Sequence, residues 1–314
     1  MASDQVSALA EEFEDRAALS SRGGSRSGGR GGRFRGGAGG GGGKNREVDI
    51  SRALSRLLRH QASNAGITLD AEGYAPLDKV LQWPPLKSLS PSFDELVSLV
   101  RTNDKQRFTL KPINPALDAE SADPSGYLIR ANQGHSIKLD NEGLLKPLAL
   151  PNPDGTLPDG TLPIPETVIH GTYFAFWPQI VASGGLKPMG RNHIHFSTGL
   201  PEDGKEEVVS GMRRDAELLV YVDVEGSMRE GGVRWWTSEN GVVLTGGGED
   251  GMVATRWFRE VKGRTQGVGI LWRDGKWVAD LPEGLKVRVP QGKGRGGGRG
   301  RGRGGRGRGR GGRS

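Results

Sequence analysis

Arginine, histidine and amide side chains gather in four short stretches whose neighbours are apolar. The stretches are 58–61, 103–108, 130–136 and 189–196, and shorter ones at 170–172 and 210–213 accompany them. Arginine grips phosphate through two parallel hydrogen bonds and stays charged at any relevant pH. Several arginines in one cleft suit a phosphate monoester dianion better than a diester. The residue types therefore indicate a phosphate-binding site.

Other kinds of catalytic site are not indicated. The sequence has no close carboxylate pair, no Ser-His-Asp pattern and no glycine loop ending in Lys-Ser/Thr. His193 and His195 are two residues apart, which on a strand places both on one face, but no carboxylate or third histidine lies near them in sequence. We therefore expect no metal. Because cysteine is absent, disulfides, zinc–thiolate sites and cysteine nucleophiles are excluded.

Several of these polar residues could instead have a purely structural role. Arg59 could lie on a solvated helix face, and Arg107 at the edge of a strand. His170 precedes Gly-Thr and could belong to a turn, and His195 could pack in the core. A functional role for these residues is favoured only because the other polar stretches occur in the same sequence.

The first elements that must position these side chains are helical. Ile50, Leu54, Leu57 and Leu58 follow helical spacing and predict one apolar helix face. Short helices are expected at 78–81 and 93–101, and strands at 108–110 and 127–131. Three short helices followed by a small β-ribbon predict a winged-helix-like lobe over residues 47–145.

The second half of the chain differs from the first in its composition and in the elements expected from it. Residues 146–166 are rich in proline and contain Asp-Gly-Thr-Leu-Pro twice in tandem, which predicts a linker or surface insertion. Beyond it we expect strands at 195–197, 218–224, 233–237 and 242–244, and a helix at 174–183. Residues 167–290 are thus expected to form a β-rich lobe, and the fold class is α+β.

The two flanks have the composition of disordered segments. Residues 21–43 and 291–314 each hold 13 glycines, interspersed with arginine. We expect disorder over 1–46, apart from a short helix at 4–19, and over 291–314. Arg-Gly repeats bind RNA with little sequence preference, although roles in solubility, localisation or methylation stay open. The flanks carry the excess basic charge, so a nucleic-acid site in the mildly acidic body must be a local patch.

The sequence also bears on location. No apolar run approaches a membrane span, and no hydrophobic signal core begins the chain. We expect a protein of the cytoplasm or nucleus, without a membrane partner, that acts as a monomer.

Taken in order, the polar stretches resemble the tRNA 2′-phosphotransferase family, from about Leu54 to about Phe258. The resemblance implies an N-terminal winged-helix lobe that holds RNA and a C-terminal lobe similar to ADP-ribosyltransferases that binds NAD⁺. The family's essential Arg-His-Arg-Arg tetrad falls on Arg59, His60, Arg107 and Arg191.

The resemblance also assigns cofactor contacts. These positions are His170, Gly171, Thr172, Asn192, His193, His195 and Val242. Residues 238–242 match the third ADP-ribosyltransferase signature, which in many relatives ends in a catalytic glutamate but here ends in Val242. Gln133, His135 and Ser136 are expected to brace the site, whereas Arg213 is expected to have a structural or RNA-contact role. The family commonly has glycine after the Arg-His pair, so Gln61 would be strained if its backbone were left-handed.

The activity implied by the resemblance has two steps, and its substrate is tRNA with an internal 2′-phosphate. A 2′-phosphate oxygen attacks C1″ of the nicotinamide ribose and nicotinamide leaves, which forms an ADP-ribosylated RNA 2′-phosphate. The ribose 2″-OH then attacks phosphorus, giving 2′-OH RNA and ADP-ribose 1″,2″-cyclic phosphate. His60 contacts phosphate or transfers a proton; the sequence leaves both open. Two other functions stay open, a non-catalytic Arg-Gly RNA-binding protein and an ADP-ribosyltransferase acting on terminal phosphates or proteins.

Overall fold

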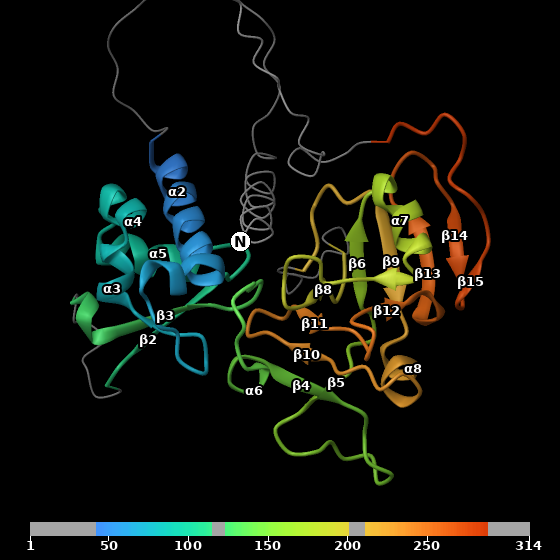
Figure 1. The fold of residues 1–314 in the computed structure, drawn as a ribbon, viewed down its shortest axis with the longest axis horizontal. Coiled ribbons are helices and arrows are strands. Elements are labelled where there is room, and N and C mark those ends of the chain that lie inside the picture. The colour runs from blue at the N-terminus through green and yellow to red at the C-terminus, as the bar shows by residue number, and fades with distance from the viewer. Residues whose placement is uncertain (1–41, 115–122, 201–210, 288–314) are drawn as a thin grey trace, which may run out of the picture.

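The computed structural model describes residues 42–114, 123–200 and 211–287, which form two lobes side by side (Figure 1). The helix expected at 4–19 and both Arg-Gly flanks lie outside these residues. Helices and strands are mixed but segregated along the chain, so the fold is α+β. Within the described residues, no helix is both long and apolar enough to cross a membrane.

The helices of the N-terminal lobe pack around one apolar core. They are α2 (Gly42–Arg56), the π-helical turn η1 (Leu57–Gln61), the 3₁₀ turn η2 (Ser63–Ala65), α3 (Leu77–Gln82), α4 (Pro84–Leu89) and α5 (Phe93–Thr102). Ile50, Leu54, Leu57 and Leu58 are all buried, so the predicted apolar face is confirmed. Helix α5 begins with a capping box, in which Ser92 and Glu95 satisfy each other's backbone N–H groups.

A three-stranded antiparallel sheet completes this lobe. Its order is β1 (Ala75–Pro76), β3 (Tyr127–Ala131), β2 (Phe108–Pro112), and the short 3₁₀ turn η3 (Pro124–Gly126) leads into β3. Phe108 and Ile129 turn into the helical core. The pairing of Phe108 with Ala131 places Arg107, just before β2, beside the residues that leave β3. The winged-helix interpretation of this lobe stays a prediction.

Two five-stranded sheets form most of the C-terminal lobe. One has the order β5 (Leu162–Pro163), β4 (Lys146–Ala149), β10 (Trp236–Thr237), β11 (Val243–Thr245), β8 (Ile194–Phe196). The other has the order β15 (Lys276–Trp277), β14 (Ile270–Arg273), β13 (Phe258–Gly263), β9 (Leu218–Val222), β6 (Ile169–Thr172). A bridge between Ile169 and Ser197 joins them at the β6 and β8 edges. Phe196, Val220, Trp235 and Phe258 belong to the core that they share.

Smaller elements close the C-terminal lobe. They are α6 (Asn141–Leu144), the 3₁₀ turn η4 (Phe174–Phe176), α7 (Trp177–Ala182), β7 (Gly185–Leu186), α8 (Val224–Arg229), β12 (Val253–Ala254) and the 3₁₀ turn η6 (Thr255–Trp257). The first four residues of the expected linker, 146–149, instead form β4, because its backbone pairs with β10 and Leu148 is buried. The proline-rich loop that follows lies at the edge of the first sheet (Figure 1).

Hydrogen bonds hold the lobes together at one junction. Asn192 donates its backbone N–H to His135 O (2.9 Å) and its amide Nδ2 to Ile137 O (2.7 Å). Asn240 Nδ2 donates to Lys105 O at 2.8 Å. Glu239 accepts from Arg130 Nη2 and from Thr109 Oγ1, each at 2.7 Å. The junction therefore brings the polar stretches of both lobes together.

Candidate active site

Arg59 and His60 lie on the π-helical turn that ends the first long helix. A π turn widens the helix locally and is frequent at functional sites. It leaves Arg59 buried, with 5% exposure, and His60 half-buried. Gln61 has no left-handed backbone, so the strain considered for this position is absent.

Residues 134–137 pack directly on this turn. Arg59 O accepts from the backbone N–H groups of Ser136 (3.1 Å) and Ile137 (3.3 Å), and His60 Nδ1 lies 2.9 Å from Ser136 Oγ. Gly134 has φ +88°, and a Cβ added there would lie 3.4 Å from the Arg59 guanidinium. Segment 134–137 therefore orients both side chains, as expected for Ser136.

Arg107 is positioned by a tight turn before β2. Gln106 has φ +44°, a left-handed conformation that is costly for a residue other than glycine. Arg107 Nη1 donates to Asn103 Oδ1 at 2.8 Å, and Arg107 itself is only 5% exposed. Asn132 donates its backbone N–H to Arg107 O and its Nδ2 to Gln106 O. Arg107 is thus hydrogen-bonded to Asn132, which lies two residues before the segment 134–137 that packs on Arg59.

Arg191 comes from the other lobe. It follows Met189, whose φ is +60°, and its backbone N–H donates to Pro188 O. The charges of Arg191 and Arg59 both act on the same buried imidazole, that of His195, and help to depress its pKa. Since Asn192 is bonded to segment 134–137, Arg191 lies at the point where the lobes meet.

Three buried imidazoles of this site, those of His135, His193 and His195, are held neutral. Burial, followed by the charge of Arg59, lowers the pKa of His135 to about 3, and burial lowers the pKa of His193 to about 4. Burial and then Arg191 depress the pKa of His195 well below its usual value. The Nε2 atoms of His135 and His195 are buried and have no hydrogen-bond partner among the described residues. These three imidazoles therefore add no positive charge at neutral pH, and two of them keep a hydrogen-bonding atom without a partner among the described residues.

Six of the residues matched to a cofactor fall into two groups. One lies on β6 (His170, Gly171 and Thr172), and the other lies on β8 or just before it (Asn192, His193 and His195). His170 Nδ1 lies 3.0 Å from His195 O, so β6 and β8 carry the histidines of both motifs side by side. Thr172 is buried, and Met212 approaches Gly171 so closely that an added Cβ would clash with the Met212 side chain.

Val242 stands apart from both groups. It is fully buried against Leu144, Leu145 and Leu244, and its backbone N–H donates to Ser238 Oγ. Its side chain offers no surface to a ligand in this arrangement, and the cofactor contact assigned to it stays a prediction.

Glu239 lies in the 238–242 signature, but the sequence did not reveal its place at the junction between the lobes. Burial alone would raise the pKa of Glu239, but hydrogen bonds from Arg130 and Thr109 outweigh burial and keep the pKa below its usual value. The carboxylate is therefore ionised at neutral pH and binds Arg130, which is stacked 4.6 Å from the Tyr74 ring centre. A partner 109 residues away leaves no local sequence signal.

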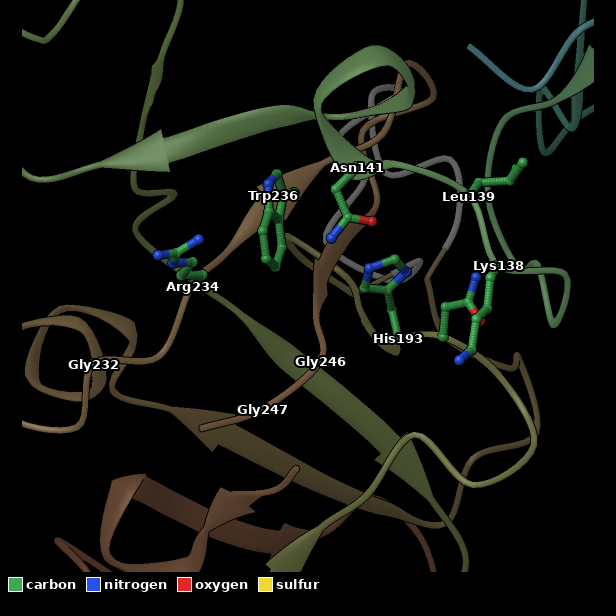
Figure 2. A pocket seen from close by; sticks show the side chains of 10 residues that line it. Lys138, Leu139, Asn141, His193, Gly232, Arg234, Trp236, Gly246 and Gly247 are labelled. Carbon is green, nitrogen blue, oxygen red and sulfur yellow. The ribbon is translucent and has the colours of Figure 1, made fainter. Parts of the chain in front are cut away.

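A cavity of about 450 Å³ opens beside this junction. It is lined by Lys138, Leu139, Asn141, Asn192, His193, Gly232, Arg234, Trp236, Gly246 and Gly247. Figure 2 shows the His193 ring between Lys138 and Trp236, below Asn141. Asn192 and His193 line the cavity and come directly after Arg191 in the chain, so Arg191 adjoins the cavity lining. No group of three or more His, Cys, Asp or Glu able to hold a metal ion occurs within the described ranges.

Comparison with known proteins identifies the family. The pattern of the RNA 2′-phosphotransferase, Tpt1 / KptA family matches residues 45–247, a range that contains every residue assigned to the site. The chain belongs to this family. The RNA 2′-phosphotransferase pattern covers most of both lobes, as the resemblance of the polar stretches predicted.

Individual relatives agree with the RNA 2′-phosphotransferase family. The tRNA 2′-phosphotransferase 1 of Mus musculus is 38% identical over 217 residues, which cover 69% of this chain and 77% of the relative. The tRNA 2′-phosphotransferase of Saccharomyces cerevisiae is 33% identical over 202 residues, covering 64% of this chain and 79% of the relative. A probable RNA 2′-phosphotransferase of Streptomyces griseus is 34% identical over 199 residues, covering 63% and 91%. These matches support a 2′-phosphotransferase activity.

Proposed function

We propose that this protein removes the internal 2′-phosphate of spliced tRNA by transferring it to NAD⁺. Family membership supports phosphate transfer, and tRNA is the substrate in the names of the mouse and yeast relatives. The observation that carries the proposal is the junction between the lobes, where Asn192, next to Arg191 in the chain, bonds to segment 134–137, which packs on Arg59. Arg59 and Arg191 at this junction, with Arg107 bonded through its carbonyl to Asn132, form a receptor for a phosphate dianion.

The N-terminal lobe is proposed to hold the RNA as a winged-helix-like module. Arg59 and Arg107 then bind oxygens of the 2′-phosphate, and both are already fixed by segment 134–137 and by Asn103. Fixed donors lose little freedom when the phosphate arrives, and they neutralise charge that builds on phosphorus. His60, oriented by Ser136, contacts the phosphate or moves a proton to the departing 2′-oxygen.

The C-terminal lobe is proposed to bind NAD⁺ as an ADP-ribosyltransferase-like module. The donor set fits a dinucleotide, since the buried His195 Nε2 has a free position among the described residues and His170 is held by His195 O. NAD⁺ supplies the anomeric carbon that accepts the phosphate oxygen as nicotinamide leaves. Arg191 supplies positive charge to the phosphate from this side, and the neutral His195 can hydrogen-bond a ribose hydroxyl without adding charge.

The test uses a short oligonucleotide with one internal 2′-phosphate, incubated with and without NAD⁺, and mass spectrometry of the products. We expect 2′-OH RNA, nicotinamide and ADP-ribose cyclic phosphate only when NAD⁺ is present. Phosphate release without NAD⁺ would contradict the proposed co-substrate. An ADP-ribosylated RNA that persists would indicate an ADP-ribosyltransferase, and tight binding without turnover would indicate an RNA-binding protein.

The Arg-Gly flanks are proposed to add RNA affinity that does not depend on sequence. Removing residues 291–314 should weaken binding more at low salt than at high salt and leave kcat on short oligonucleotides unchanged.

A further inference from the structure

The cavity beside Arg191 has the chemistry of a nucleotide site. It combines two cations, Lys138 and Arg234, with the rings of His193 and Trp236. In the view of Figure 2, Lys138 and Arg234 lie at opposite ends of a row formed by His193 and Trp236. Among the described residues, neither cation forms an ion pair, and both are exposed. The body of the protein is mildly acidic, so these two exposed cations beside two aromatic rings give this spot a local positive charge.

Glycines keep this cavity open. A Cβ added at Gly246 would have no neighbour nearer than Asn192 O at 3.9 Å, and Gly232 has nothing within 4 Å. The volume of about 450 Å³ lies within the range of about 300–1,000 Å³ typical of small-ligand sites. The space is therefore sufficient for one nucleotide.

The position of the cavity favours RNA over the dinucleotide. One edge of β8 pairs with β11, and its other edge bridges to β6, which carries His170 and Gly171. The cavity lies on the β11 and β10 side, against the connector of residues 138–141 that comes from the N-terminal lobe. A ligand on β6 and a ligand in the cavity would thus lie on opposite sides of β8, with Arg191 near both.

Beyond Trp236 the lining of the cavity becomes acidic and apolar. A second hollow of about 790 Å³ shares Asn141, Arg234 and Trp236 but adds Asp140 and Glu142, with Leu148 and Leu150. Carboxylates and apolar side chains do not favour a second phosphate. The cationic part is therefore one nucleotide long.

We propose that this cavity binds the RNA nucleotide next to the one that carries the 2′-phosphate, and this rests on the proposed function. Arg234 binds its phosphate, and its base stacks on the neighbouring Trp236 with Asn141 at the base edge. Base–aromatic stacking and phosphate contacts tolerate any base, so the subsite selects for a flanking nucleotide rather than for a sequence.

The test compares a 2′-phosphorylated mononucleotide with dinucleotides extended by one residue on the 5′ or the 3′ side. Arg234→Gln removes a cation, and Gly246→Val adds side-chain atoms to the cavity lining, with its Cβ 3.9 Å from Asn192 O. The matched controls are Arg259→Gln, an exposed arginine on β13, and Gly269→Val, where an added Cβ meets nothing within 4 Å.

For one of the two dinucleotides, we expect each cavity variant to raise KM about tenfold, and Arg234→Gln to lower its salt dependence by about one unit of log–log slope. KM for the mononucleotide and for NAD⁺, and both controls, should stay within about twofold, the scatter of surface changes. A rise in KM for NAD⁺ would assign the cavity to the cofactor, and unchanged dinucleotide kinetics would show that no RNA binds there; either overturns the proposal.

If the wild-type protein turns over no substrate, the proposed function fails by itself. The subsite is then judged by calorimetric binding of the same dinucleotides, with the same difference required between cavity variants and controls.

Discussion

Glu239 offers a way to disturb the lobe junction while every proposed phosphate-binding arginine stays in place. Its carboxylate lies 2.7 Å from both Arg130 Nη2 and Thr109 Oγ1. The Arg130 side chain is 10% exposed and that of Glu239 is 50% exposed. After Glu239→Gln, Arg130 still donates to Glu72 O and still stacks on a tyrosine ring, so its charge is not stranded.

The size of the effect follows from these contacts. A hydrogen bond between charged groups contributes about 1.5–3 kcal/mol, and solvent around the half-exposed carboxylate reduces this to about 1 kcal/mol. We therefore expect the free energy of unfolding to fall by about 1 kcal/mol in Glu239→Gln. We also expect kcat/KM on 2′-phosphorylated RNA to fall about 3- to 10-fold, because a small shift between Arg59 and Arg191 misaligns the phosphate.

Urea unfolding and steady-state kinetics measure the two effects. Glu225→Gln is the matched control, because Glu225 pairs with Arg229 at 2.9 Å on α8 and both side chains are more than half exposed. This control should change stability by less than about 0.5 kcal/mol and leave kcat/KM unchanged. If Glu239→Gln were as silent as the control in both assays, the reasoning that this bridge sets the spacing of the lobes would be refuted.

Three further predictions concern the site. Arg107→Ala and Arg191→Ala should each lower kcat by about 100-fold or more with an unchanged circular dichroism spectrum, and normal turnover in both would overturn the site assignment. Gly134→Ala should lower kcat, because its Cβ would lie 3.4 Å from the Arg59 guanidinium, whereas Gly66→Ala, at φ +70° with no neighbour within 4 Å, should cost only stability. The free energy of unfolding should be constant with respect to His193 above pH 6.5 and should fall as pH drops toward 4. Burial lowers the pKa of His193 to about 4, so in this range the unfolded chain binds a proton that the folded chain does not. His193→Gln should reduce this dependence in urea titrations at several pH values, while the lowered pKa values of His135 and His195 leave part of it in place. An unaltered slope would contradict this prediction.

The sequence predicted the elements that have local signals. The strand expected at 127–131 is β3, and the helix expected at 93–101 is α5, which Ser92 caps. Helix α4, with Pro84 at its first position, was not predicted, although proline is common there. The strand at 146–149 was hidden by proline-rich surroundings, because its partner β10 is about 90 residues away along the sequence.

The sequence predicted which residues form the site but not how the backbone positions them. The polar stretches named Arg59, Arg107 and Arg191, because arginine, histidine and amide residues are unusual among apolar neighbours. The π turn under Arg59 leaves the spacing of the apolar residues unchanged, so periodicity does not reveal it. Left-handed backbone at Gln106 is equally hidden, since tertiary hydrogen bonds to Asn132 and not residue type hold it.

The affinity of one 2′-phosphate, measured in the wild type and in single arginine variants, tests the central claim most directly. Equilibrium binding compares a short oligonucleotide bearing an internal 2′-phosphate with the same oligonucleotide bearing 2′-OH. We predict that the phosphate tightens wild-type binding at least about tenfold, as charge-assisted contacts should, and that Arg59→Ala, Arg107→Ala and Arg191→Ala each remove most of that difference. A wild-type preference that survives in all three variants would show that the arginines do not share one phosphate and would contradict the account.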